Sequence, residues 1–535
     1  MASEKHVELK FESKALGAET FSVLRFSGEE AISQLYRFEI DLVSEEPDID
    51  QDAVLGQPAT LTIQRGDDGT PRKVHGILAE FEQGQEGRFG HYRYRAVLVP
   101  RLWLLSLSRQ NQIYQNKSVV DIVEEELMGA QDKGPAELAA IGLTGQDFEF
   151  RVTGSYPVRE YVVQYQETDL DFVSRLLEHN GIFYYFEQGD THEKIVFCDD
   201  NVGFPAVVPD SKIPYNPASG TSSAGEDGYE ESVGSLNRAQ RQITGRMIVK
   251  DYNYRTPTTP LQGEADIDDL GHGLISEYGN HFKNPEEGQA LAKVRAQEIH
   301  CRKVEFVGKA DRMAFAAGTP FTLKGHYNSG FDQDYVLTRV THSGTQAYAE
   351  ATGFPEVDAN DSDYRNEFTA IPFQVPFRPA RLAPKPKLHG VMNGHIDSAG
   401  PGTRAEIDSE GRYKLVMPFD LSGTAGGKAT RWVRMAQPYG GGQQGMHFPL
   451  HKGTEVIWTC IGGDPDRPII TGVVPNPLNK SVINAESHTK NRIQTASGIL
   501  IEIEDGPGAR GETSQQGDQQ QKQRLEPVAQ VAQPA

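Results

Sequence analysis

The residues that could form a metal site lie closest together in the motif GDPDRPIITG. Asp464 and Asp466 offer two carboxylates there, but no histidine or third acid follows at the spacing of a ligand set. Arg467 can instead bridge either carboxylate across a turn that the glycine and proline residues favour. The motif therefore predicts a turn followed by a strand, and we expect no bound metal.

Three catalytic or binding motifs have partial matches in the sequence, and each lacks a required residue or spacing. A zinc motif begins at His192-Glu193, but Val196 occupies the position of its second histidine. The segment 220–225 (GTSSAG) lacks the spacing of a nucleophile elbow, and the glycines at 440–442 lack the lysine of a phosphate-binding loop. We therefore predict that the chain is not an enzyme and that it binds no cofactor.

The charge of the chain argues against two classes of partner. Its 53 lysine and arginine residues face 75 acidic residues, which gives a net charge of −22. Such a chain repels phosphate backbones and anionic lipid surfaces, so we expect no nucleic-acid partner and no stable membrane anchoring. The segment MASEKHVELK has no apolar core of the kind a signal peptide needs. We expect a cytoplasmic protein that a dedicated machine exports.

Six side chains that often carry function are predicted to be structural. The spacing of the cysteines indicates buried free thiols with no disulfide or metal site. The tryptophans lie in strand-like runs, which predicts core or interface positions. These residues are Cys198, Cys301, Cys460, Trp103, Trp432 and Trp458.

Three helices have clear ends in an otherwise strand-rich pattern. Ser118 is a predicted N-cap with Asp121 at the position of a capping box, and Thr168 is a second N-cap. The second helix should stop at Asn180-Gly181, where glycine favours a left-handed backbone. A third helix should begin at Asn284-Pro285 and bury Ala290, Leu291 and Val294.

These patterns divide the chain into several structural units, since 535 residues exceed the usual size of one core. The glycine-rich and proline-rich turns between short alternating runs favour a mainly β architecture. The predicted units are a first β-barrel (1–115), an α+β insertion (116–215), a second β-barrel (216–370), a proline-rich linker (371–386), an OB-type barrel (387–477), a terminal strand region (485–510) and a disordered tail (511–535).

Four blocks of the sequence are similar to the VgrG family of type VI secretion. They include FSGEEAISQLYRF at residues 26–38, YPVREYVVQYQETDLDFVSRLLEHNGIFYYFE at residues 156–187, AAGTPFTL with DYVLTRVTH, and GRYKLVMPFD with RWVRMAQPYGG and GDPDRPIITGVVPNP. The resemblance covers about residues 10–500. It implies a hub of two β-barrels, an OB barrel and a β-prism, assembled as a homotrimer.

The resemblance also implies the partners of such a spike. It would dock on an Hcp-type inner tube, meet baseplate proteins, puncture the target envelope and carry a PAAR-type tip cap or an effector. It would be assembled in the cytoplasm and then be translocated through the apparatus. As a first alternative, a chain with this fold would be the hub or spike of a prophage tail or of an extracellular phage-like particle. A spike with hydrolase activity is the second alternative.

Two departures from the family concern the C-terminal part. Phe419 stands where the family commonly has tryptophan, and the prism is reduced to one or two strands. The residues between Pro477 and Arg492 are too few to fold a hydrolase. Ile499, Ile501 and Ile503 form one face of a strand with no evident partner in its own chain, so we predict that they form the trimer interface. The tail from Gly506 onward is predicted to attach a partner, and a trailing segment without function is the alternative.

Overall fold

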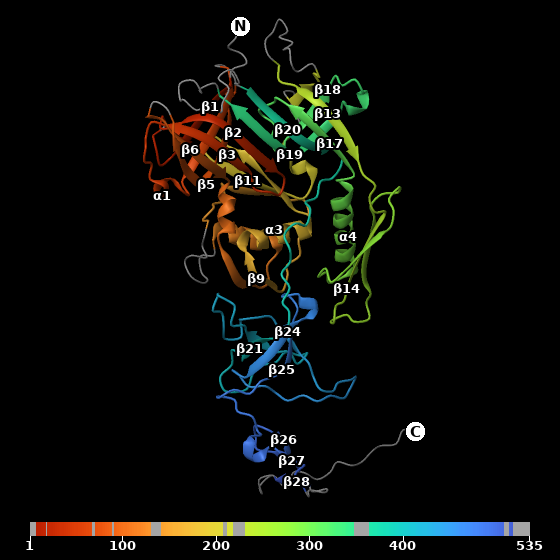
Figure 1. Ribbon diagram of the computed structural model, residues 1–535. Helices are drawn as coiled ribbons and strands as arrows, with labels where there is room; N and C mark the ends of the chain where they lie inside the picture. Colours follow the sequence, from red (N-terminus) through yellow and green to blue (C-terminus); the bar gives the residue numbers. More distant parts are fainter. Residues whose placement is uncertain are drawn as a thin grey trace. The chain divides into compact units, whose positions relative to one another are not determined.

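A computed structural model gives the fold (Figure 1). It describes residues 7–17, 19–66, 70–87, 90–129, 141–206, 211–217, 230–346, 363–507 and 513–516. The chain divides into two compact units: the first comprises Met1–Lys387 with Leu421–Gly423, and the second comprises the rest of the chain from Leu388 onward. Among the described residues, no helix is long and apolar enough to cross a membrane.

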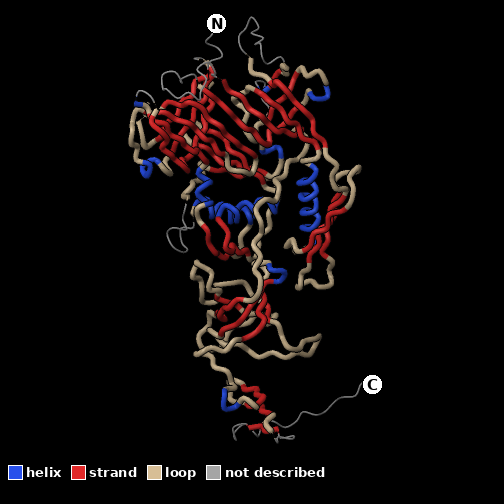
Figure 2. The backbone as a smooth tube through the Cα atoms, in the orientation of Figure 1, coloured by secondary structure: helices blue, strands red, loops and turns tan. Residues whose placement is uncertain are grey.

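A sheet of 12 strands forms most of the first unit, in which Figure 2 shows far more strand than helix. Its main path runs β1-β4-β5-β6-β3-β2-β19-β20-β17-β13, and β18 joins β12 to β19. The strands are β1 (Val7–Ser13), β2 (Ser22–Ala31), β3 (Arg37–Ser44), β4 (Pro58–Arg65), β5 (Arg72–Glu86), β6 (Tyr92–Val99), β12 (Lys212–Pro214), β13 (Val233–Gln240), β17 (Val304–Ala310), β18 (Pro320–Lys324), β19 (Asp334–Thr345) and β20 (Asp363–Pro372).

The two halves of this sheet have different main apolar clusters and are made continuous by one strand pair. Strand β2 pairs with β19 in antiparallel register from Arg25↔Thr345 to Ala31↔Arg339. One apolar cluster includes Phe26, Phe38 and Ile40, and a second includes Phe321 and Phe368. The prediction of a mainly β fold is confirmed, and the segments predicted as two barrels share a continuous sheet. The short helix α1 (Gln51–Val54) lies between β3 and β4.

The first helical insertion follows β6 and has the helix ends that the sequence predicts. Ser118 and Asp121 form the capping box of α2, and Thr168 caps α3. Gly181 ends α3 with a left-handed backbone, at φ 71°. The elements are β7 (Arg109–Tyr114), α2 (Val119–Met128), β8 (Phe148–Arg151), β9 (Val162–Thr168), α3 (Asp169–Asn180), β10 (Phe183–Gln188) and β11 (Glu193–Cys198).

A second insertion, which the sequence analysis missed, interrupts the second half of the sheet. It packs α4 (Pro285–His300) against a small sheet of β14 (Arg246–Asp251), β15 (Leu261–Asp266) and β16 (Leu274–Tyr278). Asn284 caps α4 as predicted, but the predicted stripe of buried residues was wrong. The buried residues are Gly288, Ala292, Arg295 and Ala296, whereas Ala290 is exposed and Leu291 is half-buried. The buried side of α4 is therefore the side that packs on β14 and β15 of this insertion, and the large sheet does not determine it.

The second unit contains an OB-type sheet and a terminal hairpin sheet. The first has the order β22-β21-β24-β25-β23 and the second the order β26-β27-β28. The strands are β21 (Met392–Asp397), β22 (Lys414–Val416), β23 (Arg434–Met435), β24 (Glu455–Cys460), β25 (Pro468–Val473), β26 (Lys490–Gln494), β27 (Leu500–Glu504) and β28 (Thr513–Gln516). Trp458 fills the OB core at 1% exposure, and the ring of Phe419 lies 6.1 Å from its ring.

Candidate functional site

The terminal hairpin holds the three isoleucines predicted to form the trimer interface. Ile499, Ile501 and Ile503 are 47%, 39% and 47% exposed. The prediction that their strand has no partner in its own chain was wrong, because β27 pairs with β26 on one edge and β28 on the other. Gly498, with φ 87°, permits the turn that folds the chain back, and Thr495 N–H donates to the carbonyl of Ile499 across it.

The two faces of this hairpin differ in chemistry. Residues directly opposite in an antiparallel pair project to the same face, so Ile493, opposite Ile501, extends the isoleucine face. The place of Ile493 on this face could not be predicted from the sequence, because only the strand register puts it opposite Ile501. On the other face, Glu502 accepts from Lys490 at 2.7 Å and Arg492 at 2.6 Å. These hydrogen bonds lower the pKa of the Glu502 carboxyl.

The predicted disordered tail begins inside this sheet. Strand β28 lies between residues 511 and 535 and pairs with β27, since the free backbone edge of β27 offers hydrogen-bond partners. The tail beyond residue 516, to which the sequence analysis assigns partner attachment, lies outside the described residues.

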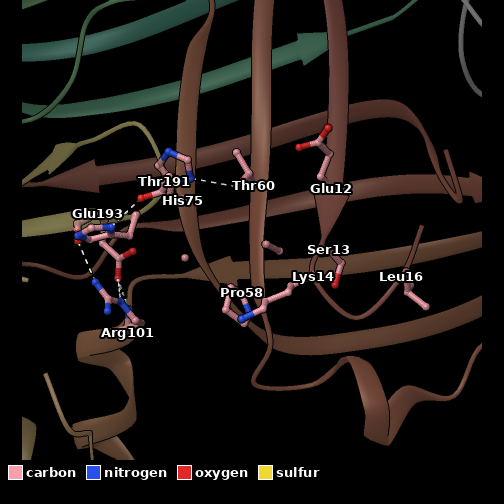
Figure 3. A pocket seen from close by; sticks show the side chains of 13 residues that line it. Glu12, Ser13, Lys14, Leu16, Pro58, Thr60, His75, Arg101, Thr191 and Glu193 are labelled. Carbon is pink, nitrogen blue, oxygen red and sulfur yellow. Dashed lines mark hydrogen bonds and ion pairs between the residues drawn. The ribbon is translucent and has the colours of Figure 1, made fainter. Parts of the chain in front are cut away.

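A cavity of about 520 Å³ lies beside the ends of β1 and β4 in the first unit (Figure 3). His75, Arg101 and Glu193 line it together with His192. The ring of His75 is 2.9 Å from both the Thr60 hydroxyl and the carbonyl oxygen of Gly189, and burial lowers its pKa. Glu193 accepts from the backbone N–H and Nε of Arg101, each at 2.9 Å. The incomplete zinc motif at His192-Glu193 thus contributes its glutamate to an internal ion pair.

A buried polar cluster lies where the two halves of the large sheet meet. Neutral His342 donates from Nε2 to Glu30 and accepts at Nδ1 from the Tyr364 hydroxyl, both at 2.7 Å. Arg72 pairs with Glu30 and donates to the carbonyl oxygens of Met313 and Phe315 at 2.9 and 2.6 Å. These contacts join residues of the two halves of the sheet and so hold the junction together.

Charge and burial set opposite states for the two titratable groups of this junction. Burial raises the pKa of Glu30, but Arg72 and His342 outweigh it and lower the pKa to about 2. Burial and the positive charge of Arg72 lower the pKa of His342 to about 4. At neutral pH the junction therefore holds an ionised glutamate and a neutral histidine.

The remaining predicted residues take structural positions. Arg467 lies 3.9 Å from Asp464 across the predicted turn. All three cysteines are buried free thiols, and burial raises the pKa of Cys198 to about 12, which makes it a poor nucleophile. Trp103 and Trp432 are half-buried.

The order of the first two parts, a two-half sheet followed by an OB-type sheet, agrees with comparisons to known proteins. The sequence pattern of the phage tail baseplate hub family (GPD) matches residues 29–348. The chain belongs to this family. The pattern of the type VI secretion system and phage-baseplate injector OB domain matches residues 408–474 of this baseplate hub protein.

The relatives of this hub protein include VgrG spike proteins, which confirms the resemblance. The type VI secretion system spike protein VgrG5 of Pseudomonas aeruginosa is 31% identical over 495 residues, which cover 90% of this chain and 58% of VgrG5. The chain thus spans little more than half the length of that relative. The prediction that it has no enzymatic activity stays a prediction.

Solved structures agree with the assignment of the hub fold. The Escherichia coli c3393 protein is a component of the type VI secretion system with structural similarity to bacteriophage tail proteins. It is 25% identical, has a TM-score of 0.61, and the match covers 87% of this hub chain and all of that chain. A chain of the Francisella PdpA-VgrG complex has a TM-score of 0.59 at 11% identity and covers 94% of this chain and 83% of its own, which supports the fold alone.

Proposed function

We propose that three copies of this chain assemble into the hub and spike of a contractile type VI secretion apparatus. The observation that carries this proposal is the isoleucine face of the terminal hairpin, where Ile493, Ile499, Ile501 and Ile503 are each 39–47% exposed. An apolar face on a small sheet has little stability in water until another surface covers it. Identical faces of further copies can cover it around a three-fold axis.

The inner tube of the apparatus is the proposed docking partner of the hub. The large sheet has two halves with separate apolar clusters, so three chains would present six similar units in a ring. Such a ring would suit an Hcp-like tube of six-fold symmetry. Baseplate proteins would surround the hub, and the tube would drive the spike outward when the sheath contracts.

The spike would puncture the target envelope and carry a PAAR-type cap or an effector at its end. We propose that the hub is assembled in the cytoplasm and translocated with the spike. The net charge of −22 supports a role that avoids nucleic acid and stable membrane anchoring.

The decisive experiment is the native mass of the purified protein, with and without residues 485–535. We expect a trimer for the full chain and weakened trimerisation for the truncated chain at low concentration. A monomeric full chain would contradict the proposal. If the truncated chain remains fully trimeric, the trimer interface lies in the large sheet and not in the hairpin.

A further inference from the structure

The segment after β20, residues 373–387, is bound along the surface of the first unit; we call it the strap. The side chain of Asn201 fixes its start, because Nδ2 donates to the carbonyls of Phe373 and Val375 at 2.7 and 2.8 Å. The Oδ1 of Asn201 accepts from the backbone of Phe377 at 2.9 Å. Phe377 is 6% exposed and packs edge-on against Phe183, with ring centroids 5.2 Å apart.

Arg378 anchors the middle of the strap to α3 and α4. Its Nε donates to Gln297 and its Nη1 to the carbonyl of Gly181, both at 2.9 Å. The carbonyl of Arg378 accepts from Arg302 at 3.0 Å. The strap is therefore held by side chains at both its start and its middle, although its prolines predict only a linker.

One carboxyl group holds the end of the strap. Oε2 of Glu178, near the C-terminal end of α3, accepts from the backbone N–H groups of Leu382 and Ala383 at 2.9 and 3.0 Å. Glu178 is 5% exposed. Beside it, Arg381 pairs with Glu277 at 2.7 Å and with Glu298 at 3.0 Å.

The surroundings of Glu178 disfavour its negative charge. Burial raises its pKa to about 7; Glu298 of α4 adds to the rise, and the two backbone donors and Arg381 oppose it. Tyr184 of β10 also lies within electrostatic range of Glu178. Arg295 of α4 is 3.7 Å from both Glu277 and Glu298, so its charge is shared with those two carboxylates.

We propose that Glu178 is a proton-controlled latch on the strap. With its proton, Glu178 holds Leu382 and Ala383 closed; without it, these two residues loosen while Asn201, Arg378 and Arg381 keep the preceding part of the strap in place. Because the strap leads directly to Leu388, the first residue of the second unit, the latch would control how freely the connection to that unit moves. The inference is independent of the trimer.

The effect of pH on the opening of the strap follows from proton linkage. In the closed strap the carboxyl binds a proton up to about pH 7, whereas in an open strap it would meet water and return toward its ordinary value of 4.5. The closed form therefore holds more protons, and a rise in pH favours opening. For one proton, the opening equilibrium changes by at most about tenfold per pH unit.

Hydrogen exchange of the intact protein tests the latch. The readout is the protection factor of the amides at Leu382 and Ala383, corrected for the intrinsic exchange rate, at pH 6 and pH 8. We expect a fall of about five- to tenfold in the unmodified chain at the higher pH. We expect no fall in Glu178→Gln, which keeps one acceptor and cannot ionise. Equal protection at both pH values in the unmodified chain, or the same fall in Glu178→Gln, would overturn the proposal.

Two further variants separate the latch from a general pH effect. Burial also raises the pKa of Glu126, to about 8, but Glu126 contacts Tyr114. Glu126→Gln should leave the fall at Leu382 and Ala383 unchanged. Glu298→Gln removes the neighbouring negative charge and should shift the fall to lower pH. An unchanged pH profile in Glu298→Gln would contradict the latch even if Glu178→Gln failed to fold.

Discussion

The strap and the terminal hairpin are both short segments outside the main cores, yet their chemistry is opposite. The backbone of the strap is bound by side chains of its own chain, Asn201 and Glu178, and Arg378 of the strap donates to the carbonyl of Gly181. The hairpin pairs its central strand β27 on both edges but leaves an isoleucine face exposed. Strand β27 is therefore paired on both edges but incompletely buried, and incomplete burial is what points to another copy of the chain.

Ile501→Asp should produce the largest effect and would test the hairpin side of this comparison. Covering one isoleucine contributes about 1.5–3 kcal/mol, and the substitution occurs in every copy, so trimerisation should weaken by at least about a hundredfold. Sedimentation equilibrium measures the change. Ile407→Asp is the matched control, because Ile407 is 47% exposed but lies outside the hairpin. If both variants weaken the trimer equally, the hairpin face is not the specific interface.

Arg72→Met should instead lower the free energy of unfolding of the first unit. The substitution leaves Glu30 charged and buried without its main partner, and breaking such a pair costs about 3–5 kcal/mol. Chemical denaturation followed by circular dichroism measures the free energy of unfolding. Arg37→Met is the control, since its pairs with Glu39 and Glu80 are exposed and such pairs contribute about 0–1 kcal/mol. Equal losses in the two variants would contradict the role of the junction.

Acid should weaken the same junction through His342. Its pKa is lowered from 6.5 to about 4, so the folded state binds fewer protons than the unfolded state between these values. The stability from neutral His342 is fully present above pH 6.5 and is lost as the pH falls through this window, by up to about 3 kcal/mol. Comparing the unfolding free energy of His342→Gln with that of the unmodified chain from pH 7 to pH 4 isolates this loss. Parallel curves for the two proteins would exclude it.

Two glycine substitutions test how closely α4 and the strap pack against the end of α3. Gly181 and Gly56 have φ of 71° and 73°, but a Cβ at Gly181 would lie 2.6 Å from Val294 and 3.2 Å from Arg378, whereas Gly56 has open space. Gly56→Ala should cost only the backbone strain, about 1 kcal/mol, and Gly181→Ala about 1–3 kcal/mol more. Thermal unfolding gives both values. Equal costs would show that Val294 and Arg378 both move aside at this point.

The sequence by itself determined the local features of this protein. The capping residues Ser118, Thr168 and Asn284 and the stop at Gly181 are fixed by interactions within a few residues, so they were predicted correctly. The mainly β fold and the OB-type sheet also followed from alternation, turns and the resemblance.

Only the tertiary structure decided which faces and edges are covered. The helix stripe around Ala292, the pairing of β27 on both edges and the place of Ile493 depend on residues distant in sequence or on strand register. The strap was predicted as a linker because its prolines favour extended backbone, but Asn201 and Glu178 are more than 170 residues away from it in the chain. Contacts over such distances leave no local pattern, because the entropy of closing the chain is overcome only when the whole unit folds.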